Sequence, residues 1–317
     1  MLLKDIAYYK TGGTCAELHS PSSVEELADV VGSVHRRRLP FFLLGGGTNS
    51  LVIDDHFPGA VITFRKLTAL TFDGTAVYAQ AGVENTQLAE ACRDRGLDGT
   101  AWMNRLPGQI GGTVRMNARC YGGEISQVVE MVTAITLSGE IRQYRDPGVF
   151  RGYKDTIFMT NGEAIAAAVI RTNHGELAAI QKRMDHCAKD RISKGQFLHP
   201  SCGCVFKNDY SIGIPSGLLL EEAGVKELIH ERMTINPHHA NFVFNRGATS
   251  REILELTFIM REAVFSKFGV WLEYEMEILG LVPNDLAEKL REHRQHVLRA
   301  EELGVLHERL RTKVRTT

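Results

Sequence analysis

Hydrophobic and polar positions along the first 191 residues predict short strands interleaved with helices. Ser22 and Ser23 place a capping hydroxyl before an acidic first turn and an apolar stripe, which predicts a helix from residue 24 to about Arg37. A second helix is expected over 85–96, where Gly96 closes its C-terminus. Short apolar or alternating runs predict strands at 40–44, 51–53, 61–64, 70–72, 76–82, 128–145 and 164–171. This mixture is typical of an α+β fold and not of a doubly wound sheet.

The last third of the chain has a different pattern, and a polar, helix-favouring stretch over 176–191 leads into it. The expected elements are helices at 217–224 and 249–268, strands at 240–245 and 270–278, and a charged, helix-prone tail over 286–313. Residues 270–278 alternate with period two. The polar face of this strand is expected to carry Trp271, Glu273, Glu275 and Glu277.

These patterns divide the chain into three parts. We expect a domain over 1–191 with two subdomains that meet near residues 65–75, a smaller domain over 192–282, and a C-terminal tail over 283–317.

Composition narrows the class of protein. The 317 residues include 44% hydrophobic and 24% charged residues, as in ordinary globular proteins. A formal net charge of -1 argues against a nucleic-acid or acidic-membrane partner, which usually needs an excess of Lys and Arg. Neither a signal-peptide core in Met1–Lys10 nor an apolar stretch of bilayer-spanning length is found in the sequence. We expect a cytoplasmic protein and, for want of any association signal, a monomer.

Six cysteines are scattered along a chain much longer than a disulfide-stabilised scaffold, which favours free thiols. Cys202 and Cys204 are separated by a single glycine, a spacing too short for a standard zinc half-site. We expect no metal site.

Two glycine-rich segments carry the first candidate chemistry. Gly45–Gly47, with Thr48 and Asn49 after them, lie between two predicted strands and offer backbone N–H groups to a pyrophosphate. Taken alone, this loop is more often an ordinary turn. A second segment with glycines at 108, 111 and 112 strengthens the cofactor hypothesis, because a large cofactor with two phosphates needs close backbone approach at several places. Arg115, Asn117 and Tyr121 follow it; the alternative is a helix end with a solvated arginine.

Four segments together carry a family resemblance. They are, in the order of the family, Leu44–Val52, Leu106–Asn117, Gly203–Asn208 and Leu272–Glu275. With these segments the chain resembles the UDP-N-acetylenolpyruvoylglucosamine reductases, also called UDP-N-acetylmuramate dehydrogenases, from about Tyr9 to Gly280. Its length resembles the shorter of the two types in that family.

The resemblance implies a fold and an activity. The fold is α+β: a two-subdomain FAD-binding fold of the vanillyl-alcohol-oxidase/PCMH type over 1–191, and a smaller α+β substrate-binding domain over 192–282. The activity is the NADPH-dependent reduction, through FAD, of the enolpyruvyl group of UDP-N-acetylglucosamine enolpyruvate to UDP-N-acetylmuramate, in peptidoglycan precursor synthesis. The implied partners are therefore a UDP-sugar and NADPH.

The resemblance also implies site residues. Residues expected to bind FAD are Leu44, Gly45, Gly46, Gly47, Thr48, Asn49, Ser50, Pro107, Gly108, Gly111, Gly112, Asn117 and Tyr121. Residues expected to bind substrate are Tyr153, Lys207, Asn208, His239 and Asn241. For His239, a solvated loop pair with His238 is the alternative.

Three catalytic residues are implied: Cys204, Glu275 and Lys154. Cys204 stands where the family has a proton-donating serine, and a thiol, with a reference pKa of about 8.5, is a stronger acid than a hydroxyl. Lys154 replaces an arginine, which keeps the charge but loses the planar two-pronged grip; Arg151 is a possible compensation. The alternatives are a small buried side chain for Cys204, a solvated strand face for Glu275 and a surface lysine for Lys154.

Two other functions remain open. One is an FAD-dependent oxidase of a small alcohol or sugar, against which the 203–208 segment and Glu275 argue. The other is a flavoprotein that has lost catalysis through Lys154 and Cys204. Both exchanges preserve charge or acidity, which favours working catalysis.

Overall fold

The protein, seen in a computed structural model, is described over residues 1–228 and 230–315, and its internal contacts define two units. Unit one contains Met1–Thr14, Asn49–Asp55 and Lys194–Thr317, and unit two contains Cys15–Thr48 and His56–Ser193. The predicted domain start at residue 192 lies next to the change of unit at Lys194. The three-part domain assignment itself stays a prediction.

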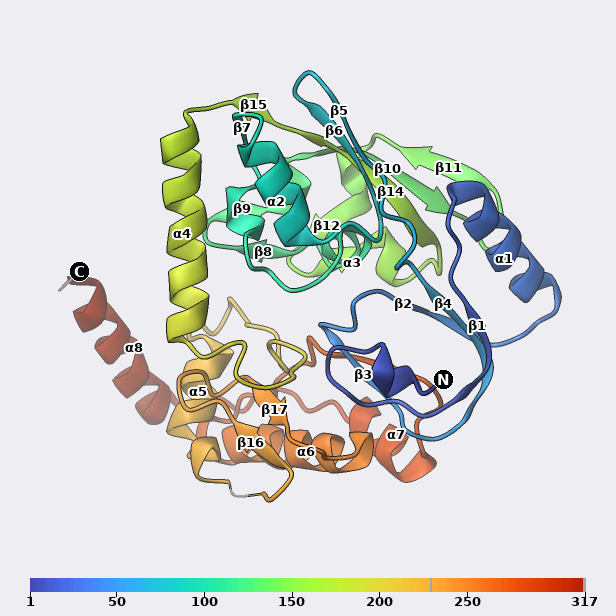
Figure 1. Cartoon of the computed structure of the whole chain (residues 1–317). Coiled ribbons are helices and arrows are strands. Elements are labelled where there is room, and N and C mark those ends of the chain that lie inside the picture. The colour runs from blue at the N-terminus through green and yellow to red at the C-terminus, as the bar shows by residue number, and fades with distance from the viewer. Residues whose placement is uncertain (229, 316–317) are drawn as a thin grey trace. The chain divides into compact units, whose positions relative to one another are not determined.

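A five-stranded antiparallel sheet forms the centre of unit two (Figure 1). Its order is β11 (Ile141–Tyr144), β10 (Val129–Ile135), β14 (Ala164–Arg171), β6 (Ala76–Gln80) and β5 (Leu70–Asp73). Ala168, in the middle of β14, pairs with Val132 on one side and Ala79 on the other. The small residues of β14 are buried and leave room for α3 (Ile110–Arg115), which packs against this strand.

A second, parallel sheet of unit two contains β1 (Cys15–His19), β4 (Phe57–Thr63) and β2 (Phe41–Leu44), in this order. The parallel β1 and β2 are connected through α1 (Val24–Arg36), whose start follows from the predicted cap: the side chain of Ser23 accepts a hydrogen bond from the backbone N–H of Glu26 at 3.0 Å. The remaining elements of unit two are α2 (Asn85–Arg93), α4 (Leu177–Ser193), β7 (Leu97–Asp98), β8 (Arg119–Cys120), β9 (Gly123–Glu124), β12 (Phe150–Gly152), β13 (Asp155–Thr156) and β15 (Asn173–His174).

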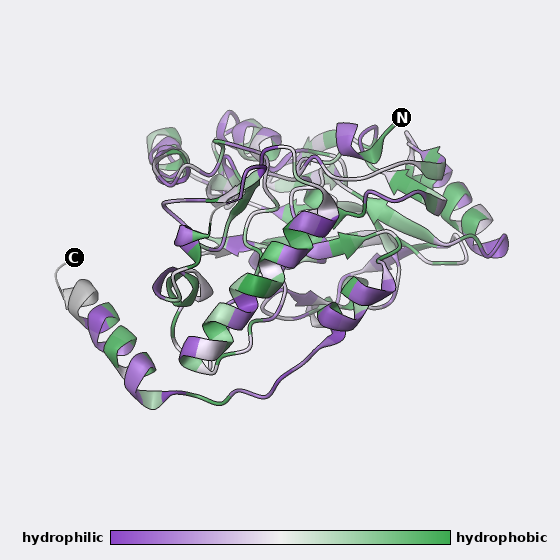
Figure 2. Ribbon diagram, turned by 90° about the horizontal axis from the view of Figure 1, so that it is seen from below, coloured by the Kyte–Doolittle hydropathy of each residue, from purple (hydrophilic) through white to green (hydrophobic). Residues whose placement is uncertain are grey.

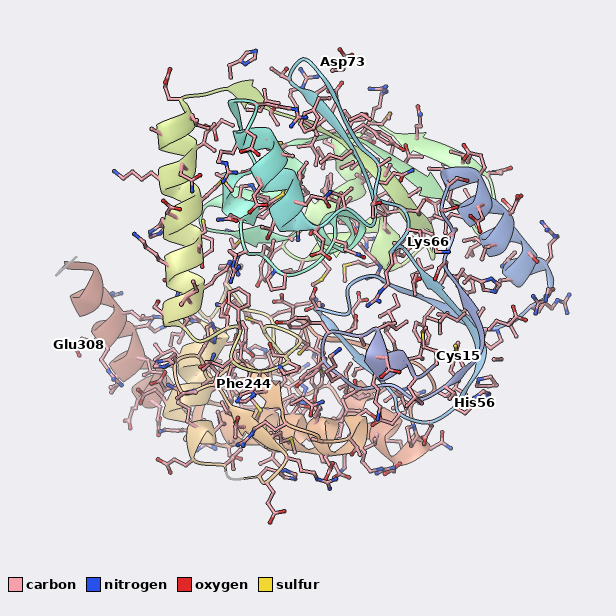
Figure 3. All side chains as sticks on the ribbon, in the orientation of Figure 1. Cys15, His56, Lys66, Asp73, Phe244 and Glu308 are labelled. Carbon is pink, nitrogen blue, oxygen red and sulfur yellow. The ribbon has the colours of Figure 1, made fainter. Side chains whose placement is uncertain are left out.

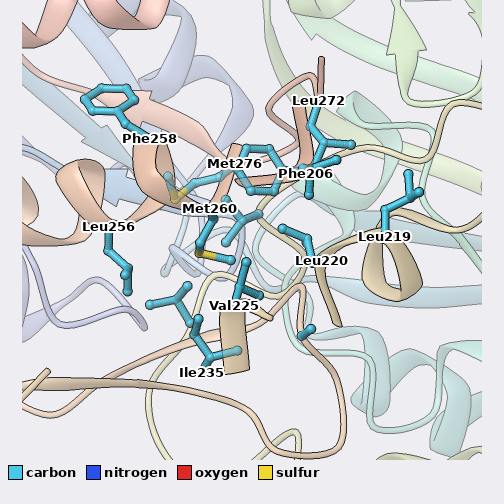
Figure 4. Packing of buried hydrophobic residues seen from close by; sticks show 14 of the residues in the cluster. Phe206, Leu219, Leu220, Val225, Ile235, Leu256, Phe258, Met260, Leu272 and Met276 are labelled. Atoms are coloured by element: carbon cyan, nitrogen blue, oxygen red, sulfur yellow. The ribbon is translucent and has the colours of Figure 1, made fainter. Parts of the chain in front are cut away.

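Unit one is built around one long helix, α6 (Ser250–Phe268), which has a capping box between Thr249 and Glu252 at its start. Its apolar residues pack in a core with side chains from the segments around Phe206 and Leu272, which Figure 4 shows from close by. The other elements of unit one are α5 (Ser216–Glu222), α7 (Asn284–Arg291), α8 (Ala300–Arg315), the antiparallel pair β16 (Met233–Ile235) and β17 (Val243–Asn245), and the parallel pair β3 (Ser50–Val52) and β18 (Glu277–Leu279).

The predicted strand over 270–278 is wrong for most of its length. Only Glu277–Leu279 form a regular ladder, and Tyr274 makes a single bridge with Phe206. Trp271, predicted on the polar face, is only 4% exposed. The physical reason is that its indole Nε1 donates to the backbone oxygen of Glu292 at 3.1 Å, a partner from the tail that local alternation does not reveal.

The predicted tail helix over 286–313 is in fact two helices, α7 and α8, with an irregular segment between them. Within residues 1–228 and 230–315, no helix combines the length and the apolar character needed to cross a bilayer.

Candidate active site

Unit two brings the two glycine-rich segments against each other. The hydroxyl of Thr48 donates to the backbone oxygen of Pro107 at 3.3 Å, and the backbone N–H of Asn85 donates to the oxygen of Gly108 at 3.0 Å. Gly108 has a φ of +122°, and a Cβ there would lie 2.9 Å from the Thr48 Oγ1. Glycine is therefore required at position 108 for the two loops to meet.

The second loop has an open position at Gly112, where a Cβ would meet nothing within 4 Å. A Cβ on Gly45 or Gly46 would make ordinary contacts with protein, at 3.6 Å from the Gln109 Oε1 and 3.5 Å from the Thr48 Cγ2, so packing does not require glycine at either position. Gly111, by contrast, is explained by packing, because a Cβ there would lie 2.8 Å from the Cβ of Ala81. Gly111 therefore has a structural role in seating α3 on the sheet.

Gln109 supplies a second observation in favour of a bound group. Its buried Oε1 has no hydrogen-bond partner among the residues that the structure describes, and it lies 3.6 Å from the Cβ position of Gly45. A buried acceptor without a donor costs about 1–3 kcal/mol, which a ligand donor would offset. The sequence analysis did not select Gln109; its only signal was a polar residue between Gly108 and the pair Gly111–Gly112.

Asn117 and Tyr121 hold strained turns beside these loops, with φ values of +43° and +50°. The amide of Asn117 is buried and donates to Glu124 at 2.7 Å and to the oxygen of Gly152 at 2.9 Å. The hydroxyl of Tyr121 donates to Asp190 at 2.8 Å. Both side chains thus have protein partners that fix the loop in which they lie.

Lys154 lies in unit two, in the turn between β12 and β13, with a φ of +53°. Its positive charge acts on Cys120: burial raises the pKa of that thiol, while Arg191 and, more weakly, Lys154 lower it. The neighbouring Tyr153 ring lies under the guanidinium of Arg119 at 5.6 Å.

Arg151 is the residue that could compensate for the exchange of the family's arginine to Lys154, but its guanidinium binds other groups. It forms an ion pair with Asp155 at 2.7 Å and donates to the backbone oxygen of Thr156 at 2.8 Å.

Unit one brings Cys204 and Glu275 together through backbone pairing. The N–H of Glu275 donates to the oxygen of Val205 at 2.8 Å, and the N–H of Lys207 donates to the oxygen of Glu273 at 2.8 Å. Two segments 70 residues apart in sequence therefore run side by side.

Cys204 and Glu275 both lie close enough to the buried Cys202 for their charges to affect its thiol. Burial raises the pKa of the Cys202 thiol above its ordinary value, and negative charge on Cys204 and on Glu275 raises it further. The Cys204 thiol and the Glu275 carboxyl group implied by the sequence thus lie in one region of unit one. All six cysteines are free thiols.

Buried amides hold this pair of segments in place. Asn241 accepts from the N–H of Phe206 at 2.9 Å and donates to its oxygen at 2.8 Å, so it clamps the backbone two residues after Cys204. Asn241 also donates to the hydroxyl of Ser216 at 3.0 Å, and Ser216 donates to Asn208 at 2.9 Å. Ser216 was not selected from the sequence because its role depends on contacts between three separated segments.

Asn49 belongs to the Glu275 side of the site. Its side-chain amide donates to the backbone oxygen of Glu275 at 2.9 Å. Its backbone oxygen accepts from the N–H of Glu277, also at 2.9 Å. Asn49, expected at the cofactor, thus positions the segment that carries Glu275. Lys207 lies 3.8 Å from Glu273.

His239 is half-buried, and its ring contacts that of Phe242, with the ring centres 4.8 Å apart. Burial, followed by the charge of Lys194, lowers the pKa of His239 below its ordinary value. The lowered pKa favours the neutral ring, and its partial burial against Phe242 differs from the solvated loop pair with His238 that was the alternative.

Comparison with known proteins identifies the class of protein. Residues 17–145 match the family model "FAD binding domain", and residues 195–279 match "UDP-N-acetylenolpyruvoylglucosamine reductase, C-terminal domain". The fold and the glycine loops thus define an FAD-binding oxidoreductase of α+β class, as the sequence predicted.

Whole-chain relatives narrow this class. The chain is 32% identical over 281 residues to UDP-N-acetylenolpyruvoylglucosamine reductase of Clostridium novyi, which covers 88% of this chain and 91% of the relative. It is 33% identical over 279 residues to the Latilactobacillus sakei protein of that name, with the same coverage. The crystal structure of UDP-N-acetylenolpyruvylglucosamine reductase from Thermus caldophilus matches with a TM-score of 0.72 at 29% identity, over 88% of this chain and 97% of that one. The chain belongs to the UDP-N-acetylenolpyruvoylglucosamine reductase family.

Proposed function

We propose that this protein reduces the enolpyruvyl group of UDP-N-acetylglucosamine enolpyruvate to UDP-N-acetylmuramate with NADPH, using FAD, in peptidoglycan precursor synthesis. Its family membership supports the reaction class. The observation that carries the proposal is the backbone pairing that places Cys204 beside Glu275, within the region matched by the family's C-terminal domain.

The residues of unit two fit FAD. The open position at Gly112, the glycine-only contact at Gly108 and the orphaned oxygen of Gln109 are features that a bound nucleotide would use. FAD, when bound, supplies the hydride that the terminal carbon of the enolpyruvyl group receives.

Cys204 completes the reduction by giving its thiol proton to the carbon next to the one that receives the hydride. The S–H bond breaks, a C–H bond forms, and solvent returns the proton to sulfur. A thiol is acidic enough for this step and is still largely protonated at neutral pH, given its reference pKa of about 8.5. Asn241 keeps the thiol in place through the backbone of Phe206.

Glu275 has both of its backbone groups bound, the N–H by Val205 and the oxygen by Asn49, so the origin of its side chain is fixed. We assign its carboxyl group to sharing a proton with the substrate. Lys154 is assigned to the negative charge that develops on the enolate and carboxylate, on the strength of its place in the family motif. Tyr153, Lys207, Asn208 and His239 remain proposed substrate contacts, and a cytoplasmic monomer without nucleic-acid or membrane partners stays a prediction.

The oxidase alternative is less well supported, because the chain matches the reductase family over the segment that carries Cys204 and Glu275. An anaerobic flavin assay separates the two. The purified protein is expected to be yellow, to bleach with NADPH, and to recolour when the enolpyruvyl UDP-sugar is added. If air, admitted in place of the UDP-sugar, recolours the flavin at a comparable rate, the result favours the oxidase. If the reduced flavin stays bleached after the UDP-sugar is added, the result contradicts the proposed reaction.

A further inference from the structure

The match to the family's C-terminal domain ends at Leu279, yet the chain continues through two more helices. Residues 283–315, here called the C-terminal strap, all belong to unit one. We propose that the C-terminal strap is a positioning element that orders the Trp271–Glu275 segment and thereby sets the affinity for the UDP-sugar. This inference rests on the proposed function.

The strap contacts Trp271 directly. The guanidinium of Arg294, from the strap, lies 4.5 Å from the indole centre, and that of Arg261, from α6, lies 4.1 Å from it. The indole Nε1 donates to the oxygen of Glu292, also in the strap. Two cations over one ring, together with a bound N–H, fix both the position and the rotation of this side chain.

Arg294 ties the strap to α6 as well. It makes two hydrogen bonds to Glu262, at 2.8 Å and 2.6 Å, and a third to Glu292 at 2.7 Å. Such two-pronged pairing is specific to arginine, since lysine offers no planar fork.

The same network reaches the catalytic segment. Arg261 donates to the strap oxygen of Lys289 at 2.7 Å, and its guanidinium also lies 5.0 Å from the ring of Tyr274. Tyr274 contacts the ring of Phe206 at 5.1 Å between centres, and it precedes Glu275 directly. A chain of contacts therefore runs from the strap to both segments of the proposed site.

Backbone bonds hold the strap against the end of α6. The N–H of Val297 donates to Gly269 at 2.8 Å, and that of Arg299 donates to Phe268 at 3.1 Å. The approach is so close that a Cβ on Gly269, which has a φ of +68°, would lie 1.6 Å from the Val297 oxygen. Glycine at 269 thus serves both the end of the helix and the seat of the strap.

Helix α8 anchors the far end of the strap. Leu303 and Leu306 are buried in the same core as Phe206 and Leu272. In Figure 2, hydrophilic and hydrophobic positions alternate along this helix near the C-terminus, as expected for one that packs on one side. Glu308, labelled in Figure 3, lies on the same helix and is exposed.

The strap also touches the loop before α5. His296 lies 3.9 Å from Asp209, the residue after Asn208, and a Cβ on Gly213 would lie 3.2 Å from the ring of His307. The strap therefore contacts the second segment to which substrate binding is assigned.

The physical reason for an effect on affinity is preorganisation. The 270–276 segment has one bridge and no regular ladder: backbone bonds hold it at Glu273 and Glu275, and the strap network holds the side chains of Trp271 and Tyr274. If the strap orders it in advance, substrate binding need not supply that ordering free energy. Loosening the strap should then weaken binding while leaving the saturated reaction rate nearly unchanged.

The test compares Arg294→Ala with Arg291→Ala. Arg291 lies in the same strap, is exposed, and makes no ion pair or ring contact with the residues that the structure describes. The dissociation constant of the UDP-sugar is measured on the flavin-loaded enzyme from the change in flavin absorbance. We expect a rise of about five- to tenfold for Arg294→Ala, a smaller rise for Arg294→Lys, and no change for Arg291→Ala. The rate constant for flavin reoxidation at saturating substrate should change less than about twofold.

A second readout reports the packing itself. In a Trp102→Phe background, Trp271 is the only tryptophan left of the two in the chain, and Arg294→Ala should shift its fluorescence to longer wavelength as the ring becomes solvated. A red shift with an unchanged dissociation constant, or equal dissociation constants in the alanine variants of 294 and 291, would overturn the inference. If the unmodified enzyme fails to bind or turn over the UDP-sugar, the proposed function fails, and the fluorescence still shows whether the strap holds Trp271.

Discussion

Cys204 and Lys154 differ from the residues of the family motif, but each keeps one property of the residue that it replaces. A thiol still carries a transferable proton, and an ammonium still carries a positive charge, but neither is a copy of the serine or arginine of the family motif. Next to Cys204, Asn241 clamps the backbone of Phe206, and Val205 pairs with the backbone of Glu275. For Lys154 the structure defines the local turn, and the proposed role rests on the family motif.

His239 makes a prediction about pH. Burial lowers its folded-state pKa below the ordinary 6.5, so the unfolded chain binds the proton more tightly than the folded chain does. The free energy of unfolding contributed by this group is therefore complete above about pH 6.5 and is lost as the pH falls towards the lower, folded-state pKa. In urea unfolding at pH 7.5 and 5.5, the wild-type protein should lose more free energy of unfolding than His239→Gln. Equal losses would show that the ring is not held neutral.

At the scale of elements, local sequence signals predicted well where both partners lie within a few residues. The Ser23 cap set the start of α1, and the Thr249–Glu252 capping box sets that of α6, which the sequence analysis placed at 249–268. The same reasoning failed at Trp271, whose partners are Arg261 and residues of the strap. Alternation in sequence does not detect a single position that distant residues cover: Trp271 is buried under the strap, whereas Glu273 on the same predicted face is exposed.

In the candidate site too, the sequence predicted residues that short motifs identify and missed those defined by contacts distant in sequence. Motifs predicted Cys204 and Glu275 because short segments carry their identity. Gln109 and Ser216 were missed, since an orphaned oxygen and a hydroxyl between two asparagines are defined by contacts distant in sequence. Asn49 and Gly111 were selected as cofactor residues, yet each has a structural contact that also explains it.

The meeting of the two glycine loops makes a prediction about flavin retention. Gly108→Ala and Gly74→Ala both force alanine into a positive φ, which at Gly74, in the left-handed helical region, costs roughly 1–2 kcal/mol. Only the first also drives a Cβ to 2.9 Å from Thr48, whereas a Cβ at Gly74 meets nothing within 4 Å. Gly74 lies beside Asp73, labelled in Figure 3 at the tip of the β5–β6 hairpin.

We expect Gly108→Ala to lose bound flavin, measured as flavin absorbance per protein, and Gly74→Ala to keep it. Equal flavin content in two comparably folded variants would remove the two loops from the cofactor site.

At the scale of the whole molecule, chain order and spatial grouping differ. Met1–Thr14 and Asn49–Asp55 group with the C-terminal part in unit one, so the loop after β2 contributes residues to both units. This explains why Asn49 supports the Glu275 segment while Gly45–Thr48 meet the second glycine loop. A single boundary placed from the hydrophobic pattern cannot show that residues 49–55 group with the C-terminal part. That grouping depends on the pairing of strand β3 with strand β18, which is distant in sequence.

The central claim is that Cys204 gives a proton to the reduced substrate. Its most direct test is a single-turnover experiment in which the flavin is first reduced with NADPH without oxygen and is then mixed with the enolpyruvyl UDP-sugar. Cys204→Ala should be reduced normally but reoxidised about 10²–10⁴-fold more slowly than wild type, whereas Cys204→Ser should keep most of the rate. Reoxidation of the alanine variant at the wild-type rate would contradict the claim.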